Sequence, residues 1–171
     1  MKIAVGILTV SDRCSKSLRR DESGPALRRL VESQGWQVAQ LAVEPDEQEK
    51  IKETLLDWSD GKSLALILTT GGTGLGPRDV TPEATRAVLD KELPGLAQWM
   101  RLEGAKKSER AMLSRALAGA RGGSLIINLP GSPRGAIDSL KVVLNLVPHA
   151  LAMLQGEGHE NEQASAAGDI L

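Results

Sequence analysis

The chain has 171 residues, a length typical of one compact domain, and 41% of them are hydrophobic. Its formal charge is −1 at pH 7, and it contains no Phe or Tyr. Such a composition offers neither the basic surface nor the stacking side chains of nucleic-acid-binding proteins, so we expect no nucleic-acid partner. The single cysteine, Cys14, excludes an internal disulfide and a zinc site built from several cysteines.

The first residues run directly into an apolar segment and lack the basic start, long apolar stretch and small-residue cleavage site of a signal peptide. Charged residues interrupt the apolar runs before these reach the roughly 20 residues that cross a bilayer. We therefore expect a cytoplasmic protein that is not exported and does not span a membrane.

Three apolar runs bounded by turn residues predict buried strands, over residues 3–10, 64–68 and 125–129. Residues 36–43 alternate in part between apolar and polar side chains, which predicts a fourth strand nearer the sheet edge. Helical spacing of apolar residues predicts helices over 26–34 and 47–59.

The second half continues this pattern. Residues 82–108 are predicted to be helical with an interruption at 93–95, and residues 111–121 to form a strand hairpinned onto the next one. From Arg134 to Leu154 the spacing is helical, and Pro148 is expected to kink or split the helix. Residues 156–171 are polar, rich in alanine and unpatterned, which predicts a disordered tail after a single domain over 1–155.

Strands that alternate with helices predict an α/β fold, with right-handed crossovers and a mainly parallel, doubly wound sheet covered on both faces. Such folds bind ligands beyond the carboxyl ends of their strands. The loops after Val10, Leu68 and Leu129 are therefore the candidate sites.

The loop Thr70-Gly71-Gly72-Thr73-Gly74 follows a predicted strand and precedes a helix. Glycines let backbone N–H groups approach an anion, threonine hydroxyls add donors, and a helix start favours negative charge. This favours a phosphate-bearing ligand, although a tight strand-to-helix connection with glycines at positive φ is the alternative. The loop matches neither the Walker A sequence nor the dinucleotide fingerprint.

Charged residues near this loop have two interpretations each. Asp79 could hold Mg²⁺ against phosphate oxygens, or tie down backbone before the helix start at Thr81-Pro82. Asp46 begins an Asp-Glu-Gln-Glu segment, a pattern that favours a helix cap. Arg78 could neutralise phosphate or simply lie on the surface.

The loop over 128–133 also joins a strand to a helix, with Ser132 as the cap and Pro133 in the first turn. The loop over 9–13 brings hydroxyl and carboxylate groups to the same sheet edge, and together these loops predict an anion-lined cleft. His149 and His159 lie in the last helix and the tail, so a nucleophile paired with a histidine is disfavoured. Phosphoryl or nucleotidyl transfer fits better, because an attacking phosphate is already ionised near pH 7.

Six motifs carry a resemblance to a known family: Thr9–Asp12, Pro45–Glu47, Thr70–Gly74, Pro77–Thr85, Leu113–Arg115 and Asn128–Pro133. In this order they closely resemble the molybdopterin adenylyltransferase family, whose domain also occurs in gephyrin and in the plant molybdenum cofactor enzyme. The resemblance implies a three-layer α/β/α sandwich, usually a homotrimer. It also implies transfer of AMP from ATP, the co-substrate, to the terminal phosphate of molybdopterin with Mg²⁺, after which a separate protein inserts molybdate.

By this resemblance Asp46 and Asp79 match the family's two essential acidic residues, which we expect to be catalytic and to hold Mg²⁺ and the ATP phosphates. Asp21 matches a motif of lesser importance, and Leu75-Gly76 falls in a variable stretch. The positions expected to bind substrate or nucleotide are Ser11, Asp12, Thr70, Gly71, Gly72, Thr73, Gly74, Arg78, Ser114, Arg115, Asn128, Pro130, Gly131 and Ser132.

Two alternatives stay open. A sister branch of small trimeric molybdenum cofactor proteins shares the glycine loop and binds pterin without clear catalytic work. A trimeric scaffold, as in gephyrin, is the other. The two acidic positions and Leu113-Ser114-Arg115 lean towards the enzyme.

Overall fold

The computed structural model describes residues 2–156, so the tail expected over 156–171 lies, apart from Gly156, outside the described residues. The strands are β1 (Ala4–Val10), β2 (Gln37–Glu44), β3 (Leu66–Thr70), β4 (Lys91–Glu92), β5 (Ala118–Arg121) and β6 (Ser124–Leu129). They form one sheet in the order β2-β1-β3-β6-β5-β4. Strands β2, β1, β3 and β6 are parallel to one another, whereas β5 is antiparallel to β6 and β4 is antiparallel to β5. The mainly parallel sheet is confirmed.

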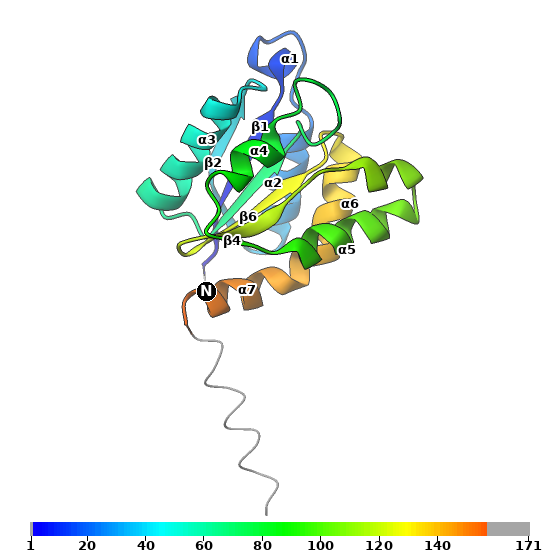
Figure 1. The fold of residues 1–171 in the computed structure, drawn as a ribbon. Coiled ribbons are helices and arrows are strands. Elements are labelled where there is room, and N and C mark those ends of the chain that lie inside the picture. Colours follow the sequence, from blue (N-terminus) through cyan, green and yellow to red (C-terminus); the bar gives the residue numbers. More distant parts are fainter. Residues whose placement is uncertain (1, 157–171) are drawn as a thin grey trace, which may run out of the picture.

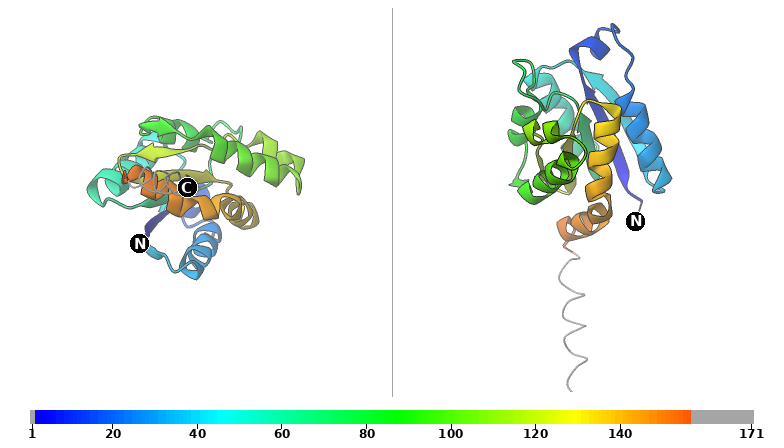
Figure 2. Two further views of the ribbon diagram at one scale, coloured as in Figure 1. Left: turned by 90° about the horizontal axis from the view of Figure 1, so that it is seen from below. Right: turned by 90° about the vertical axis from the view of Figure 1, so that its right-hand side faces the viewer.

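Helices cover both faces of this sheet (Figures 1 and 2). They are α1 (Asp12–Ser15), α2 (Ser23–Ser33), α3 (Gln48–Leu56), α4 (Thr81–Arg86), α5 (Pro94–Ala105), α6 (Pro133–Val143) and α7 (Val147–Leu154). A π-helical turn, Asp57–Gly61, continues α3, and short 3₁₀ turns span Glu109–Leu113 and Leu144–Leu146. Since α2, α5, α6 and α7 pack on one face and α3 and α4 on the other, the molecule is the expected three-layer α/β/α sandwich.

The central strands supply both cores because their side chains alternate between the two faces. Ile7 and Ile127 point to the α2, α5 and α6 layer, and Leu8 and Ile126 to the α3 and α4 layer. All four are fully buried. Burial on both faces is why these strands have continuous apolar sequences, and each such side chain contributes about 1.5–3 kcal/mol.

Two expected elements differ from the structure. The strand expected over 111–121 is a 3₁₀ turn up to Leu113, and only β5 pairs with β6. The interruption expected at 93–95 lies earlier, between the end of α4 at Arg86 and the start of α5 at Pro94, because Lys91 and Glu92 form the edge strand β4 on β5. The helix from residue 133 is split at Leu144–Leu146, and Pro148 lies in the first turn of α7, where its missing N–H costs nothing.

Residues 133–154 qualify by length and composition as one candidate membrane span, with a mean hydropathy of 1.4 over the best 18-residue window. The expectation that no segment would be long and apolar enough to cross a membrane is therefore wrong for this segment, by length and composition. The apolar stripe of this segment, which includes Leu140 and Val147, packs into the larger core. Since 28% of that window is buried, core packing accounts for only part of its apolar character.

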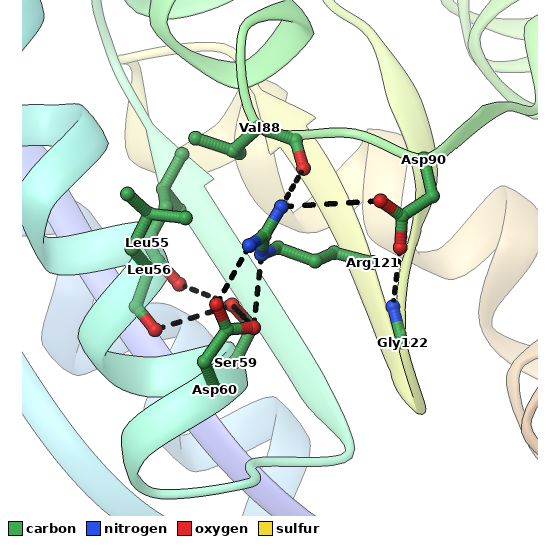
Figure 3. A network of polar contacts seen from close by, with 8 residues as sticks. All are labelled: Leu55, Leu56, Ser59, Asp60, Val88, Asp90, Arg121 and Gly122. Carbon is green, nitrogen blue, oxygen red and sulfur yellow. Dashed lines mark hydrogen bonds and ion pairs between the residues drawn. The ribbon is translucent and has the colours of Figure 1, made fainter.

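A polar network (Figure 3) lies at the β5–β6 turn, at the end of the sheet opposite the candidate loops. The guanidinium of Arg121 in β5 donates to both carboxylate oxygens of Asp60 at 2.9 and 2.6 Å and to the carbonyl of Val88 at 2.8 Å. Asp90 accepts from the N–H of Gly122 in the β5–β6 turn at 2.8 Å. The network therefore joins the π-helical turn to the β5–β6 hairpin.

Candidate active site

Three loops meet at the carboxyl ends of β1, β3 and β6, which are adjacent and parallel. The hydroxyl of Thr70 donates to the carbonyl of Pro130 at 2.7 Å, and the N–H of Gly71 donates to the carbonyl of Leu129 at 3.1 Å. Ser132 caps α6 by accepting from the N–H of Gly135, as expected. The expectation that these loops lie side by side is confirmed.

Two glycines in the loop after β3 hold backbone conformations that other residues rarely adopt. Gly71 has φ 104° and Gly72 has φ 62°. A Cβ at Gly71 would collide with the carbonyl oxygen of Val10, and one at Gly72 would lie 3.1 Å from Oδ1 of Asp46. The loop therefore passes directly over the end of β1 and beside Asp46, which requires glycine for contact as well as for conformation.

Asp46 lies against the loop after β1. Its Oδ2 accepts from the backbone N–H of Asp12 at 2.8 Å, and its own N–H donates to Oδ1 of Asp12 at 3.1 Å. The N-cap residue of α3 is Glu47, so the interpretation of Asp46 as a helix cap is wrong. Arg78 donates through two nitrogens to the Asp12 carboxylate, at 3.0 and 2.9 Å.

The pKa values of Asp12 and Asp46 are shifted in opposite directions. The hydrogen bond from Arg78 lowers the pKa of Asp12. Burial raises the pKa of Asp46, and the negative charges of Asp12 and Asp79 raise it further. Asp46 is thus a partly desolvated carboxylate beside other acids, an arrangement common at functional sites.

Asp79 has both of its expected environments. Its Oδ2 accepts from the N–H of Gly76 at 2.7 Å, so the carboxylate does tie down the loop. It also lines a cavity together with Asp46. The structural role and a place in the site are therefore compatible.

Arg115 holds the glycine loop and the segment that follows it through hydrogen bonds to their backbone carbonyls. Its guanidinium donates to the carbonyls of Gly74 at 2.7 Å and Asp79 at 2.6 Å, and pairs with Glu83. Its backbone N–H donates to the carbonyl of Thr73 at 2.9 Å. Burial raises the pKa of Glu83, but the hydrogen bond from Arg115, a backbone hydrogen bond and the positive charges of Arg115 and Arg86 together outweigh it, so the pKa is lowered. The Arg115 guanidinium is thus used in fixing the loop.

Asn128 is fully buried, and its side chain is satisfied within the protein. Its amide nitrogen donates to the hydroxyls of Thr69 and Thr85, both at 2.9 Å, and its oxygen accepts from the N–H of Leu117 at 3.1 Å. The structure therefore places Asn128 beneath the site, as a link between β3, α4 and β6.

Two cavities open on either side of the glycine loop, of about 340 and about 810 Å³. We call them the smaller and the larger cavity. They have four residues in common, which we call the shared wall: Gly72, Asp79, Gly131 and Ser132. The two cavities therefore adjoin at this wall.

The expected site residues divide between the cavities. Those found only in the smaller cavity are Ser11, Asp46, Thr70 and Gly71. Those found only in the larger cavity are Thr73, Gly74, Ser114 and Pro130. Those that line neither are Asp12, Arg78, Arg115 and Asn128, and of these the first three position the loops.

Sequence patterns do not single out several charged residues of the lining. They are Arg19, Arg20 and Glu22 in the smaller cavity and Lys107, Arg110, Arg134 and Asp138 in the larger one. None of them has a role assigned from the sequence, so only the fold shows that they line a cavity. Asp21, expected to matter less, accepts from the hydroxyl of Thr9 at 2.8 Å and the N–H of Gly24 at 3.0 Å, and so holds the start of α2 against β1.

The described residues contain no group of three or more His, Cys, Asp or Glu side chains placed to hold a metal ion. Mg²⁺, however, is commonly bound by one or two carboxylates together with substrate phosphates. The negative charge of Asp79 contributes to the raised pKa of Asp46, both residues line the smaller cavity, and a cation bound there would offset that repulsion. The donor set therefore fits Mg²⁺ that arrives with a nucleotide.

Comparison with known proteins gives a consistent result. The family model described as "Probable molybdopterin binding domain" matches residues 6–149. A molybdopterin adenylyltransferase of Helicobacter pylori is 38% identical over 156 residues, which cover 90% of this chain and 89% of that protein. The molybdenum cofactor synthesis protein cinnamon of Drosophila melanogaster is 43% identical over 89% of this chain, which spans only 26% of that longer protein.

A solved structure with a high similarity is that of the molybdopterin biosynthesis enzyme MoaB from Thermus thermophilus. It is 52% identical, has a TM-score of 0.86, and the match covers 90% of this chain and 97% of that one. The fold of the site-bearing loops is thus shared with proteins of molybdopterin biosynthesis.

Proposed function

This chain belongs to the molybdopterin-binding domain family of molybdenum cofactor biosynthesis, and on that premise we propose that it is a molybdopterin adenylyltransferase. It transfers AMP from ATP to the terminal phosphate of molybdopterin and releases pyrophosphate. The relatives at 36–38% identity whose length it nearly matches carry that name.

The observation that carries the proposal is the pair of cavities that meet at the shared wall. A transfer between two phosphate-bearing molecules needs two binding spaces and one place where their phosphates touch. The wall offers backbone N–H groups of two glycine-containing loops and the hydroxyl of Ser132 at the start of α6, an environment that favours phosphate.

We assign ATP to the smaller cavity and molybdopterin to the larger. Asp46 and Asp79 both line the smaller cavity, where a metal-bound triphosphate needs carboxylates. The larger cavity has the volume for a pterin substrate, and its cations Lys107, Arg110 and Arg134 suit a terminal phosphate. When bound, Mg²⁺ would neutralise phosphate charge and help to align the reacting oxygens.

The residues of the chain supply position and electrostatics in this proposal. Asp46 and Asp79 would hold Mg²⁺ and the phosphates in the smaller cavity beside the shared wall, and Arg115 keeps the loop of Asp79 in place. A molybdopterin phosphate, with a second pKa of about 6, is already ionised near neutral pH. The reaction therefore requires no general base, consistent with the absence of a histidine among the described residues that line the two cavities.

The test is to incubate the purified protein with molybdopterin, Mg²⁺ and ATP labelled at the α-phosphate, and to follow label on the pterin and release of pyrophosphate. Asp79→Asn should lose activity by about 100-fold or more, because the carboxylate charge is lost while an acceptor for the Gly76 N–H remains. Asp90→Asn is the matched control, since Asp90 also holds a loop glycine but lies in the network of Figure 3. Wild-type protein that transfers no label would refute the proposal.

A second candidate is a pterin-binding protein of the sister branch, favoured by the 52% identity to the MoaB structure. It predicts tight molybdopterin binding without label transfer. A scaffold role, by analogy with gephyrin, which is among the relatives, predicts partner binding that survives Asp79→Asn.

The resemblance also supports three further proposals: a homotrimer, a cytoplasmic location, and hand-over of the product to a separate molybdate-insertion protein. Sedimentation analysis of the full chain tests the first. Co-purification with an insertion protein, with and without product, tests the last.

A further inference from the structure

Two cations in the smaller cavity have no role in the function proposed so far. Arg19 and Arg20 lie in the segment that joins α1 to α2, and both line this cavity with Asp46 and Asp79. Both residues are exposed. Among residues 2–156, neither guanidinium has a hydrogen-bond or ion-pair partner, in contrast to Arg78 and Arg115.

The two arginines that hold the loops are already engaged. Arg78 is held by Asp12, and Arg115 by Glu83 and two carbonyls. The lining of the smaller cavity otherwise holds four carboxylates, those of Asp21, Glu22, Asp46 and Asp79. This lining repels a triphosphate unless cations offset it, and among the described residues Arg19 and Arg20 are the only basic ones in it.

The direction of the proposed reaction places the leaving group near these arginines. In phosphoryl and nucleotidyl transfer, the attacking and leaving oxygens lie roughly in line on opposite sides of the phosphorus. If the molybdopterin phosphate attacks from the larger cavity across the shared wall, the leaving pyrophosphate points away from that wall, into the smaller cavity. Resting on the proposed function, we infer that Arg19 and Arg20 bind the β- and γ-phosphates of ATP and stabilise the departing pyrophosphate.

The step balances without another reactant. An oxygen of the terminal molybdopterin phosphate bonds to the α-phosphorus, and the bond from that phosphorus to the oxygen bridging to the β-phosphate breaks. The electron pair leaves with the pyrophosphate, and no proton has to move. Guanidinium groups suit the charge that develops on the leaving oxygen, because they donate two parallel hydrogen bonds to phosphate.

The first experiment needs no catalysis. Calorimetric titration with inorganic pyrophosphate and Mg²⁺ should show binding to the wild type, weakened about tenfold or more in Arg19→Ala/Arg20→Ala. The matched control is Arg13→Ala/Lys16→Ala. It removes two positive charges from the adjacent segment of the sequence, at residues that do not line the cavity. That control should bind pyrophosphate nearly as the wild type does.

The second experiment uses the labelled-ATP assay. The Arg19/Arg20 variant should show a higher KM for ATP and weaker product inhibition by pyrophosphate, with an unchanged KM for molybdopterin. Equal pyrophosphate binding by the wild type and both double variants would overturn this inference even if label transfer is normal. Weakened pyrophosphate binding in the Arg19/Arg20 variant alone, with no label transfer by the wild type, would support the site while refuting the adenylyltransferase.

Discussion

Asp12 and Asp46 exchange hydrogen bonds, each backbone N–H donating to the carboxylate of the other residue, over 2.8 and 3.1 Å. The two residues are 34 positions apart, so the pair fixes the loop after β1 to the loop after β2. Oδ1 of Asp46 is left beside the shared-wall glycine Gly72. The pair therefore sets where the Asp46 carboxylate lies in the smaller cavity.

Asp12→Ala should lower kcat for adenylyl transfer by about 10- to 100-fold, because Asp46 loses the acceptor of its N–H and Arg78 loses its partner. Asp12→Asn keeps an oxygen that can accept from the Asp46 N–H, and should retain most of the activity. Steady-state kinetics with labelled ATP compare the two variants. Equal losses would show that the charge of Asp12, rather than its hydrogen bond, is required.

Asp46→Asn should increase thermal stability at neutral pH while it abolishes activity. Burial and the neighbouring carboxylates raise the pKa of Asp46 in the folded protein, so its ionised form destabilises the fold. The stability advantage of Asn should be present above the folded pKa. It should vanish as the pH falls below the unfolded value of about 3.9, where the carboxyl is protonated in both states. Thermal unfolding of both proteins across this pH range is the measurement, and a lower Tm for Asp46→Asn at pH 7 would contradict it.

The sequence predicts the central strands and the three loops well, because burial on both faces and clustered glycines leave local signals. It does not predict β4, since Lys91 and Glu92 are exposed and become a strand only by pairing with β5. Helix spacing around Asp46 suggests a cap, because the partner that overrides it, Asp12, is distant in the chain. Arg19 and Arg20 carry no motif, so their place in a cavity follows from the fold alone.

Arg115→Lys should loosen the glycine loop, because an ammonium group cannot match the planar fork that reaches Gly74, Asp79 and Glu83 together. We expect kcat to fall by about tenfold or more, through misplacement of Asp79. Trypsin should also cleave faster after Arg78, which lies in the held loop. Peptide mapping of a limited digest measures this rate, and ATP analogues that close the site should slow cleavage in the wild type.

Glu83→Gln is the companion variant, because it keeps an acceptor for Arg115 without the charge. It should fall between the wild type and Arg115→Lys in both kcat and cleavage rate. If Arg115→Lys reduces kcat with an unchanged cleavage rate, the role of Arg115 is electrostatic at the shared wall rather than mechanical.

Arg121→Ala should affect stability and leave the chemistry intact, because the network drawn in Figure 3 lies at the β5–β6 turn, at the other end of the sheet from both cavities. The guanidinium joins Asp60 of the π-helical turn to the carbonyl of Val88, and its loss leaves that carbonyl without this donor. We expect Tm to fall by about 2–4 °C.

This difference in Tm between variant and wild type should shrink at high salt and at low pH, because Asp60 is half exposed and its pKa is lowered by the hydrogen bond from Arg121. Calorimetry gives Tm, and kcat and KM at 25 °C should equal those of the wild type. A changed KM for ATP would mean that the two ends of the sheet are coupled.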